Sequence, residues 1–360
     1  MPEICKDLKG QLLKTILSSS KVFITGHNEP DFDSISSAIG IERLCEELGK
    51  DAYIIVDDCE TTLEPSVKKI IDNGRRKYNI IKLPEFLSLI DSDSSLVVVD
   101  ANKDYQLSVS AYLPAFKSRI IIDHHNPDSH TINATYSYIN PSVSSAAEVV
   151  ARVLNAFSIP YDSEVANYLL AGIELDTNRY KKNTTSITHD VAEKLIDKGA
   201  STDFVNRLFL AEFETDCRIN NLVYNGSLFE KYEKNAFQYR QASFTLNRTA
   251  PTTIYKKEDL AKAADRMLDY NVDVAFALGF VKEDLISVSA RSKSDINVGE
   301  IMEEFNGGGN AQSAACKIPS TDILTIEEQL KSAVKRRIIS PNKCQAIAML
   351  DHSQYVKVKK

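Results

Sequence analysis

Short runs of apolar, mostly β-branched residues recur through the first half of the chain and predict strands that are buried on both faces. The runs are KVFITGH (21–27), DAYIIVDD (51–58), SLVVVDA (95–101) and SRIIIDHH (118–125). Continuous Val and Ile content is typical of a parallel sheet with helices on each side. Apolar residues at helical spacing indicate helices at 34–49 and at about 144–157, 163–175 and 187–198. This half therefore predicts an α/β domain with a parallel sheet.

A second pattern begins near residue 235 and predicts a smaller α/β domain with a mixed sheet. It contains a strand (236–246), a helix (256–270), two strands joined by a polar turn (272–291) and a helix with a glycine stop (298–309). We expect four parts along the chain: a first domain at 1–199, a helical connector at 200–234, a second domain at 235–338 and a tail at 339–360.

Composition places the chain among globular proteins and excludes some functions. The hydrophobic share is 43%, the charged share is 26% and the net charge is −7. A protein with a net negative charge is poorly suited to bind along a long nucleic acid. A small anionic ligand, in contrast, needs only local positive charge or a metal. The six cysteines form no CxxC pair, which indicates reduced thiols. Neither a membrane span nor a signal peptide is evident in the sequence, so we expect a cytoplasmic protein with no membrane segment in this chain.

Acidic and imidazole side chains gather where the predicted strands end. They are His27, Asp31, Asp33, Asp100, Asp123, His124 and His125, with Asp176 at the end of a helix. Ligands of open parallel sheets bind outside the carboxyl ends of the strands, so these segments can meet in one crevice. Carboxylates and imidazoles without thiolates suit Mn²⁺, Mg²⁺ or Fe²⁺. Two such ions ~3.5 to 4 Å apart can hold a hydroxide and clamp a phosphoryl oxygen.

Each residue of this set also has a simpler explanation. Asp31 and Asp33 could cap the helix that begins near Ser34, and Asp100 could belong to a turn. The imidazoles of residues 124 and 125 could be hydrogen-bonded core groups. However, three of the six histidines lie in two motifs, and both motifs fall at predicted strand ends. The combination favours a metal cluster, because packed carboxylates repel one another unless cations lie among them.

Four ordered motifs resemble those of the DHH phosphoesterases. They are GHNEPDFDSISSAIG (26–40), VVVDA (97–101), DHH (123–125) and AGIELDT (171–177). In the second region, SVSARS (287–292), INVGEIM (296–302) and NGGGNAQSAACK (306–317) are similar to the DHHA1 substrate-binding domain. The resemblance covers about residues 10–325, and it implies a DHH catalytic domain at 1–199 and a DHHA1 domain at 235–338.

Within this family, the chain looks most like the catalytic part of the membrane-anchored cyclic-di-AMP phosphodiesterases. The resemblance implies hydrolysis of a phosphodiester in a small nucleotide, with cyclic di-AMP converted to linear pApA. The alternative is a nano-RNase or a phosphatase of 3′-phosphoadenosine 5′-phosphate, and RecJ-type exonucleases are a more distant third. The cyclic-di-AMP enzymes carry membrane helices and sensor domains before the catalytic part. We expect this chain to be a stand-alone relative or to lack that upstream part.

The resemblance also implies a role for each residue of the cluster. His27 and Asp31 would hold one metal, and Asp100 would bridge to the other. The second metal would be completed by Asp33, His124 and Asp176. His125 would stand beside the scissile phosphate, and Asp123 would fix an imidazole through a hydrogen bond. The implied cofactors are two divalent ions, with manganese preferred and magnesium, iron or cobalt as alternatives.

Substrate contacts are expected from the second domain. The candidates are Arg291, Gly307, Gly308, Gly309 and Asn310. A guanidinium can pair two phosphate oxygens, and glycines with a helix start at 310 would let backbone N–H groups approach a phosphate. The alternatives are a surface arginine and a flexible helix stop.

The asparagine at position 310 stands where the family has His, which leaves the preferred nucleotide open and permits a nucleotide-binding relative without catalysis. The expected partner is a cyclic dinucleotide or a short oligoribonucleotide. A homodimer stays open.

Overall fold

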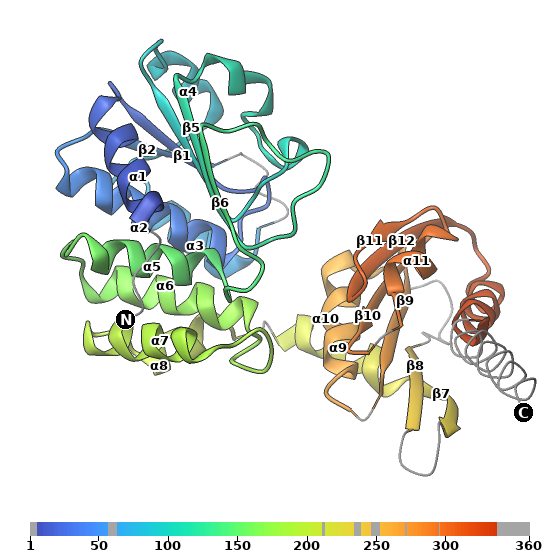
Figure 1. Cartoon of the computed structure of the whole chain (residues 1–360). Helices are drawn as coiled ribbons and strands as arrows, with labels where there is room; N and C mark the ends of the chain where they lie inside the picture. The colour runs from blue at the N-terminus through green and yellow to red at the C-terminus, as the bar shows by residue number, and fades with distance from the viewer. Residues whose placement is uncertain are drawn as a thin grey trace, which may run out of the picture. The chain divides into compact units, whose positions relative to one another are not determined.

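The computed structural model describes residues 6–56, 63–210, 213–233, 239–245, 253–270, 272–294 and 296–336. The chain divides into two compact units, Met1–Leu210 and Ala211–Lys360 (Figure 1). Each unit has its own sheet and its own hydrophobic core. No helix within the described residues has both the length and the apolar character needed to cross a bilayer.

The first unit is built on a six-stranded parallel sheet with strand order β3-β2-β1-β4-β5-β6. The strands are β1 (Val22–Thr25), β2 (Ala52–Ile55), β3 (Ile80–Ile81), β4 (Ser95–Val99), β5 (Ser118–Asp123) and β6 (Tyr136–Ile139). The order changes direction between β1 and β4, and such a switch point opens a crevice at the carboxyl ends of the strands. The predicted parallel sheet is confirmed.

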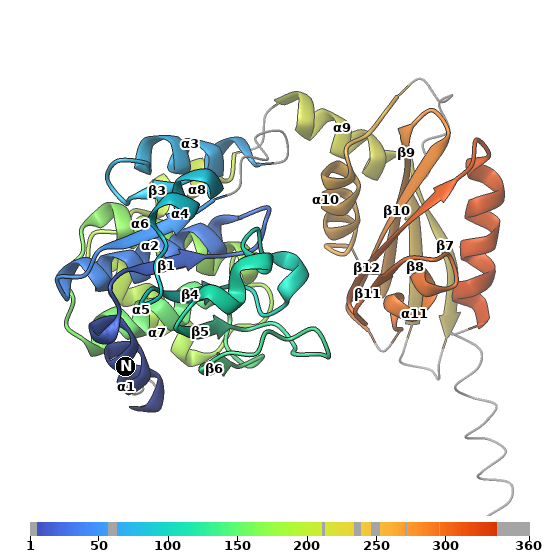
Figure 2. The same cartoon turned by 90° about the horizontal axis from the view of Figure 1, so that it is seen from above.

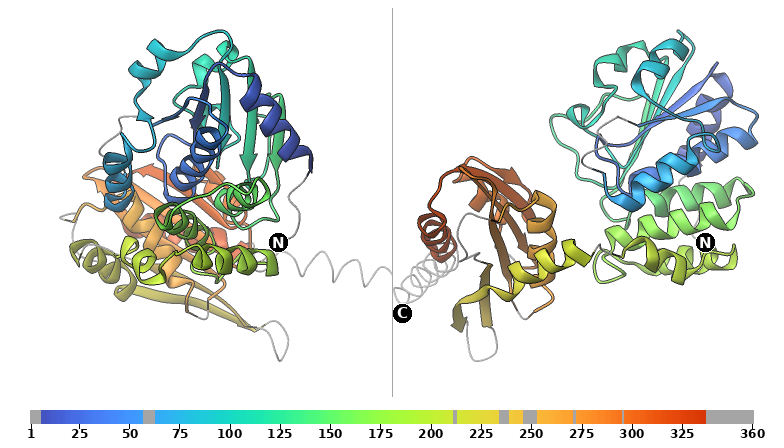
Figure 3. Two further views of the ribbon diagram at one scale, coloured as in Figure 1. Left: turned by 90° about the vertical axis from the view of Figure 1, so that its left-hand side faces the viewer. Right: turned by 180° about the vertical axis from the view of Figure 1, so that it is seen from behind.

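Helices cover both faces of this sheet, as the apolar runs predict. Val97 and Val99 of β4 pack into one buried cluster with residues of α1, α2, α3, α5, α6 and α7, whereas Leu96 and Val98 pack on the other face with Phe86 of α4. In Figures 1 and 3 the green helices α5 to α8 form a layer beside the sheet. The helices are α1 (Lys6–Ser18), α2 (Phe32–Glu47), α3 (Pro65–Gly74), α4 (Leu83–Leu89), α5 (Ala146–Ala156), α6 (Ser163–Asp176), α7 (Ser186–Asp197) and α8 (Thr202–Leu208), with 3₁₀ turns η1 (Asp104–Gln106) and η2 (Ser110–Ala115).

Helices α2, α5 and α6 meet closely at Gly172. A Cβ atom at this position would lie 2.9 Å from the Cβ of Ala147 and 3.0 Å from the Cα of Asp33. The glycine therefore brings the first turns of α2 and α5 against α6, the helix that ends at Asp176. Close packing at Gly172 thus holds together three helices, α2, α5 and α6, which carry candidate metal ligands or lie next to them.

The second unit has a six-stranded mixed sheet with order β11-β12-β10-β9-β8-β7, in which only β8 and β9 are parallel. Helices α9 and α10 pack on one face, and α11 and the helix at 323–336 pack on the other (Figure 2). The strands are β7 (Gly226–Glu233), β8 (Tyr239–Thr245), β9 (Val274–Lys282), β10 (Leu285–Ser292), β11 (Gly308–Gly309) and β12 (Ser313–Pro319). The named helices are α9 (Phe213–Tyr224), α10 (Lys257–Met267) and α11 (Val298–Glu303). The smaller α/β domain with a mixed sheet is confirmed.

Two local predictions for this unit are wrong. The expected helical connector at 200–234 includes strand β7, because residues 226–233 pair antiparallel with β8, the next strand along the chain. The expected helix start at 310 is absent, because the chain enters strand β12 at Ser313 and pairs with β10 and β11. The tail at 339–360 lies outside the described residues. The proposed domain limits at 199, 234 and 338 stay predictions.

Replacement of Gly172 by alanine should destabilise the first unit by about 1 to 2 kcal/mol. The added methyl group overpacks the junction of α2, α5 and α6, and this cost exceeds the gain of about 1 kcal/mol in helix propensity. Gly10→Ala is the matched control, because Gly10 lies in α1 with nothing within 4 Å of an added Cβ, and it should stabilise by about 0.5 to 1 kcal/mol. Urea unfolding followed by circular dichroism measures both. Equal effects of the two substitutions would contradict the close packing.

Candidate metal centre

The candidate ligands meet at the carboxyl edge of three neighbouring strands. His27 follows β1, Asp100 follows β4, and Asp123 ends β5 directly before His124. Since the strand order places β4 between β1 and β5, these strand ends are adjacent. Helix α2, which carries Asp33 in its first turn, packs against α6 and so brings that turn beside the end of α6.

The side chains form two groups that share one carboxylate. In the first group, His27 Nε2 lies 3.4 Å from Asp100 Oδ2 and 3.8 Å from Asp31 Oδ1. In the second group, His124 Nε2 lies 3.4 Å from Asp100 Oδ1 and 2.8 Å from Asp176 Oδ2. The same nitrogen lies 3.7 Å from Oδ2 of Asp33, the remaining member of this group. The structure thus brings all six proposed ligands together, and metal binding by them stays a prediction.

Asp100 occupies a strained backbone conformation. Its φ is +55°, in the left-handed region that costs most residues roughly 1 to 2 kcal/mol but that Asp and Asn tolerate better. The backbone N–H of Asp100 donates to the carbonyl of Ile122 at 3.0 Å, so the turn is tied to strand β5. In this turn, Asp100 Oδ2 faces the imidazole of His27, and Oδ1 faces those of His124 and, at 3.6 Å, His125.

The capping alternative is also realised. Asp31 is the N-cap of α2, and its Oδ1 accepts a hydrogen bond from the N–H of Ser34 at 3.0 Å. The fully buried carboxylate of Asp33 instead accepts bonds from the first two N–H groups of α5, Ala146 at 2.8 Å and Ala147 at 2.7 Å. A carboxylate oxygen has two lone pairs, so both side chains retain capacity for a cation. Capping and metal binding are therefore compatible here.

Burial and mutual repulsion control the charges of the cluster. Burial raises the pKa of Asp33, and the negative charges of Asp100 and Asp176 raise it further. Burial alone would lower the pKa values of His27 and His124, but the neighbouring carboxylates outweigh it and raise both to about 11. Burial likewise opposes ionisation of Asp100, yet the two imidazoles hold its pKa below the usual range. The carboxylates thus require positive charge among them, which protons on the imidazoles supply when no other cation does.

The donor set fits divalent cations. Asp100 Oδ1 and His124 Nε2 are buried, and neither takes part in a hydrogen bond of good geometry in the described part of the chain. Buried polar atoms are rarely left in this state, so they suggest an additional partner. Carboxylate oxygens and imidazole nitrogens are ligands for Mn²⁺, Mg²⁺ or Fe²⁺.

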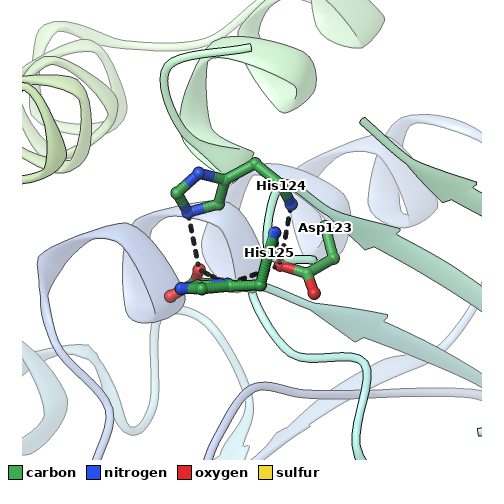
Figure 4. A group of neighbouring side chains, drawn as sticks. Asp123, His124 and His125 are labelled. Atoms are coloured by element: carbon green, nitrogen blue, oxygen red, sulfur yellow. Dashed lines mark hydrogen bonds and ion pairs between the residues drawn. The ribbon is translucent and has the colours of Figure 1, made fainter. Parts of the chain in front are cut away.

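Asp123 organises the DHH segment (Figure 4). Its Oδ1 accepts hydrogen bonds from the backbone N–H groups of His124 at 2.7 Å and His125 at 3.2 Å, and it lies 2.8 Å from His125 Nδ1. This contact raises the pKa of His125, whose side chain is 54% exposed. A buried carboxylate therefore orients an accessible imidazole at the rim of the cluster.

Asn102 supports the site but is not identified by the sequence motifs. Its side chain is fully buried behind the DHH segment. Its Nδ2 donates to the backbone carbonyl of His125 at 3.0 Å. Its position two residues after Asp100 is the only sequence signal, and it becomes informative once β4 and β5 are known to be neighbours.

The proposed substrate contacts of the second unit are only partly brought together. Arg291 and Gly307 line one groove, but Gly308, Gly309 and Asn310 do not line it. Arg291 Nε donates to Asp265 at 2.8 Å. Asn310 Oδ1 accepts bonds from the N–H groups of Gln312 at 2.9 Å and Ser313 at 2.8 Å, so this side chain shapes the turn into β12. Substrate binding by all five stays a prediction.

Comparison with known proteins identifies both parts of the chain. A family model described as the DHH family, N-terminal domain, matches residues 21–173, and the DHHA1 domain model matches residues 246–338. The chain is 31% identical over 334 residues to the cyclic-di-AMP phosphodiesterase PdeA of Listeria monocytogenes, covering 90% of this chain and 48% of that protein. It is 29% identical over 348 residues to a membrane protein–large ribosomal subunit bL9 fusion protein of Aster yellows witches'-broom phytoplasma, covering 94% and 40%. The chain thus spans less than half the length of these two relatives.

A shorter relative matches along nearly its whole length. The bifunctional oligoribonuclease and PAP phosphatase NrnA of Thermus thermophilus is 23% identical over 335 residues, covering 92% of this chain and 94% of that protein.

A solved exopolyphosphatase-related protein from Bacteroides fragilis shares the fold, with a TM-score of 0.74, 20% identity and coverage of 94% of this chain and 99% of that chain. RecJ from Thermus thermophilus in complex with Mn²⁺ has a TM-score of 0.52 at 12% identity, covering 92% and 54%. The predicted family domains are confirmed: the chain carries the N-terminal domain of the DHH family followed by a DHHA1 domain.

Proposed function

We propose that the chain is a two-metal phosphoesterase that hydrolyses a phosphodiester bond in a small nucleotide. The observation that carries the proposal is the pair of ligand groups that share Asp100. Their four carboxylates, on Asp31, Asp33, Asp100 and Asp176, carry four negative charges when ionised. Two divalent cations carry four positive charges, so a loaded centre would be electrically balanced before an anionic substrate arrives.

The position of each residue in the cluster indicates the role that we propose for it. His27 and Asp31 would hold one ion, Asp33, His124 and Asp176 would hold the other, and Asp100 would contact both. Bound divalent ions would supply Lewis acidity, which lowers the pKa of water and stabilises charge on phosphoryl oxygens. His125 is accessible and oriented by Asp123, so it would donate a hydrogen bond to an oxygen of the substrate phosphate.

Cyclic di-AMP is the substrate that we propose, with linear pApA as the product and manganese as the preferred metal. A relative at 31% identity is a cyclic-di-AMP phosphodiesterase, and RecJ was solved with Mn²⁺. The second candidate is nano-RNase or 3′-phosphoadenosine 5′-phosphate phosphatase activity, because NrnA matches the chain over 94% of its own length. A nucleotide-binding relative without catalysis is less well supported, because the side chains proposed as metal ligands lie close to one another. The proposal includes a cytoplasmic location, and it does not depend on whether the chain forms a homodimer.

Asp100→Asn should lower the hydrolysis rate with Mn²⁺ by at least about a hundredfold while the fold persists. Asparagine keeps the tolerance for a left-handed backbone but removes the shared negative charge. The hydrolysis rate on cyclic di-AMP tests the loss of activity, and an unfolding curve tests whether the fold persists. Asp197→Asn is the matched control, because Asp197 is exposed at the end of α7, and it should leave the rate unchanged. A folded Asp100→Asn protein with full activity would remove the shared-ligand role.

A substrate panel decides between the two candidate reactions. With saturating Mn²⁺, we expect cyclic di-AMP to be hydrolysed with a kcat/KM at least about tenfold above that for linear pApA or 3′-phosphoadenosine 5′-phosphate. Product identification by chromatography should show pApA before AMP. A reversed order of kcat/KM would favour the second candidate, and tight binding without turnover of any compound would favour the non-catalytic one.

Metal affinity should increase with pH between about 6 and 9. The metal-free protein keeps protons on His27 and His124, because the pKa of each is raised to about 11, and a metal must displace them. Each displaced proton makes the apparent affinity about tenfold higher per pH unit. Titration calorimetry with Mn²⁺ in buffers of different ionisation enthalpy counts the released protons. An affinity that does not change with pH would contradict binding through these imidazoles.

A further inference from the structure

A groove lined by both apolar and charged side chains runs over one face of the sheet in the second unit. Its volume is about 630 Å³, and its lining comes from α10, β10, β12 and the residues before β11. Along β10, the side chains of Ser287, Ser289 and Arg291 face this groove, while the alternate residues Val288 and Ala290 pack into the hydrophobic core. Small side chains on the groove face leave space above the sheet.

Two lysine side chains, Lys257 and Lys317, also line this groove. Lys317 of β12 pairs with Ser287, and Ser313 pairs with Arg291. Lys257, at the first position of α10, lines the same groove as Lys317. Ser287 and Arg291 are four residues apart, which corresponds to about 13 Å along a strand. The groove therefore has a lysine end and an arginine end.

The two ends differ in how their charge is balanced. Arg291 donates to the carboxylate of Asp265 and, through Nη1, to the Ser289 hydroxyl at 3.2 Å, which fixes the guanidinium. Lys257 and Lys317 are both exposed, and within the described ranges neither forms an ion pair with a carboxylate. Lys257, with a smaller contribution from Lys282, lowers the pKa of Lys317 because the ammonium groups repel one another. An anion at this end would relieve that repulsion.

We propose that Lys257 and Lys317 form a phosphate-binding subsite, which takes a second phosphate group of a nucleotide whose other phosphate or sugar lies along Ser289 and Arg291. This inference rests on the proposed function, because it assumes a nucleotide ligand, and it narrows the ligand class to nucleotides with at least two phosphate groups. Two lysines offer up to six N–H donors, and hydrogen bonds from charged donors to phosphate are the strong ones. Glu258 lines the same groove and opposes an anion, which provides a variant with the opposite sign.

Binding to the full chain without hydrolysis tests the subsite. In EDTA, the parent should bind linear pApA, which has two phosphate groups, more tightly than ApA, which has one. Lys257→Gln combined with Lys317→Gln should weaken pApA binding by about 10- to 100-fold and leave ApA binding within about twofold. The salt dependence of pApA affinity should also weaken in the double variant, because fewer charge pairs remain to be screened. Glu258→Gln should strengthen pApA binding. Lys262→Gln, on the same helix but outside the groove lining, is the control and should change neither affinity.

The outcomes separate this inference from the proposed function. Equal loss of affinity for both dinucleotides in the double variant, or unchanged pApA binding, would overturn the subsite even if the parent hydrolyses nucleotides with Mn²⁺. Absence of binding of either dinucleotide by the parent would also overturn it. Conversely, the expected loss of pApA affinity together with no hydrolysis of any nucleotide by the metal-loaded parent would retain the subsite and reject the proposed reaction.

Discussion

The first unit depends on the compensation of negative charge at one edge of its sheet. Four carboxylates and two imidazoles lie within a few ångströms around Asp100, mostly out of contact with water. Such a set is unfavourable unless positive charge is placed among the acids. Protons on the imidazoles meet this need in part, which explains their raised pKa values, and backbone N–H groups at the start of α5 meet it at Asp33. Divalent cations would meet it most completely, so the same constraint links the fold to the proposed chemistry.

Helix packing turns this electrostatic requirement into a defined geometry. The close approach of α2, α5 and α6 at Gly172 places Asp33 against the N-terminus of α5. Asp176 reaches the cluster because α6 packs on α2. The strand order brings the residues after β1, β4 and β5 to the same edge. Neither the sheet nor the helix layer alone would assemble both ligand groups.

Much of this arrangement could be predicted from the sequence, for identifiable reasons. Uninterrupted Val and Ile runs indicate doubly covered parallel strands, and acidic or imidazole residues directly after those runs indicate a site at the strand ends. The missed features depend on hydrogen-bond partners that the pattern of apolar residues does not specify. Strand β7 is defined by its pairing with β8, and the role of Asn102 depends on the neighbouring DHH backbone. Asn310 shows a local ambiguity instead. Its Oδ1 accepts hydrogen bonds from the N–H groups of Gln312 and Ser313 and so shapes a turn into a strand, where the local pattern favoured a helix.

Because Asp100 lies in a left-handed turn, the residues of the candidate metal centre differ in how well they tolerate substitution. At this position the backbone admits few residue types at low cost, and only one of them, aspartate, also supplies a shared negative charge. Asp31, with φ −103°, has an ordinary extended backbone. Changes in metal preference by exchange of ligands are therefore physically easier at the periphery of the cluster than at its centre, where backbone shape and ligand chemistry would have to change together.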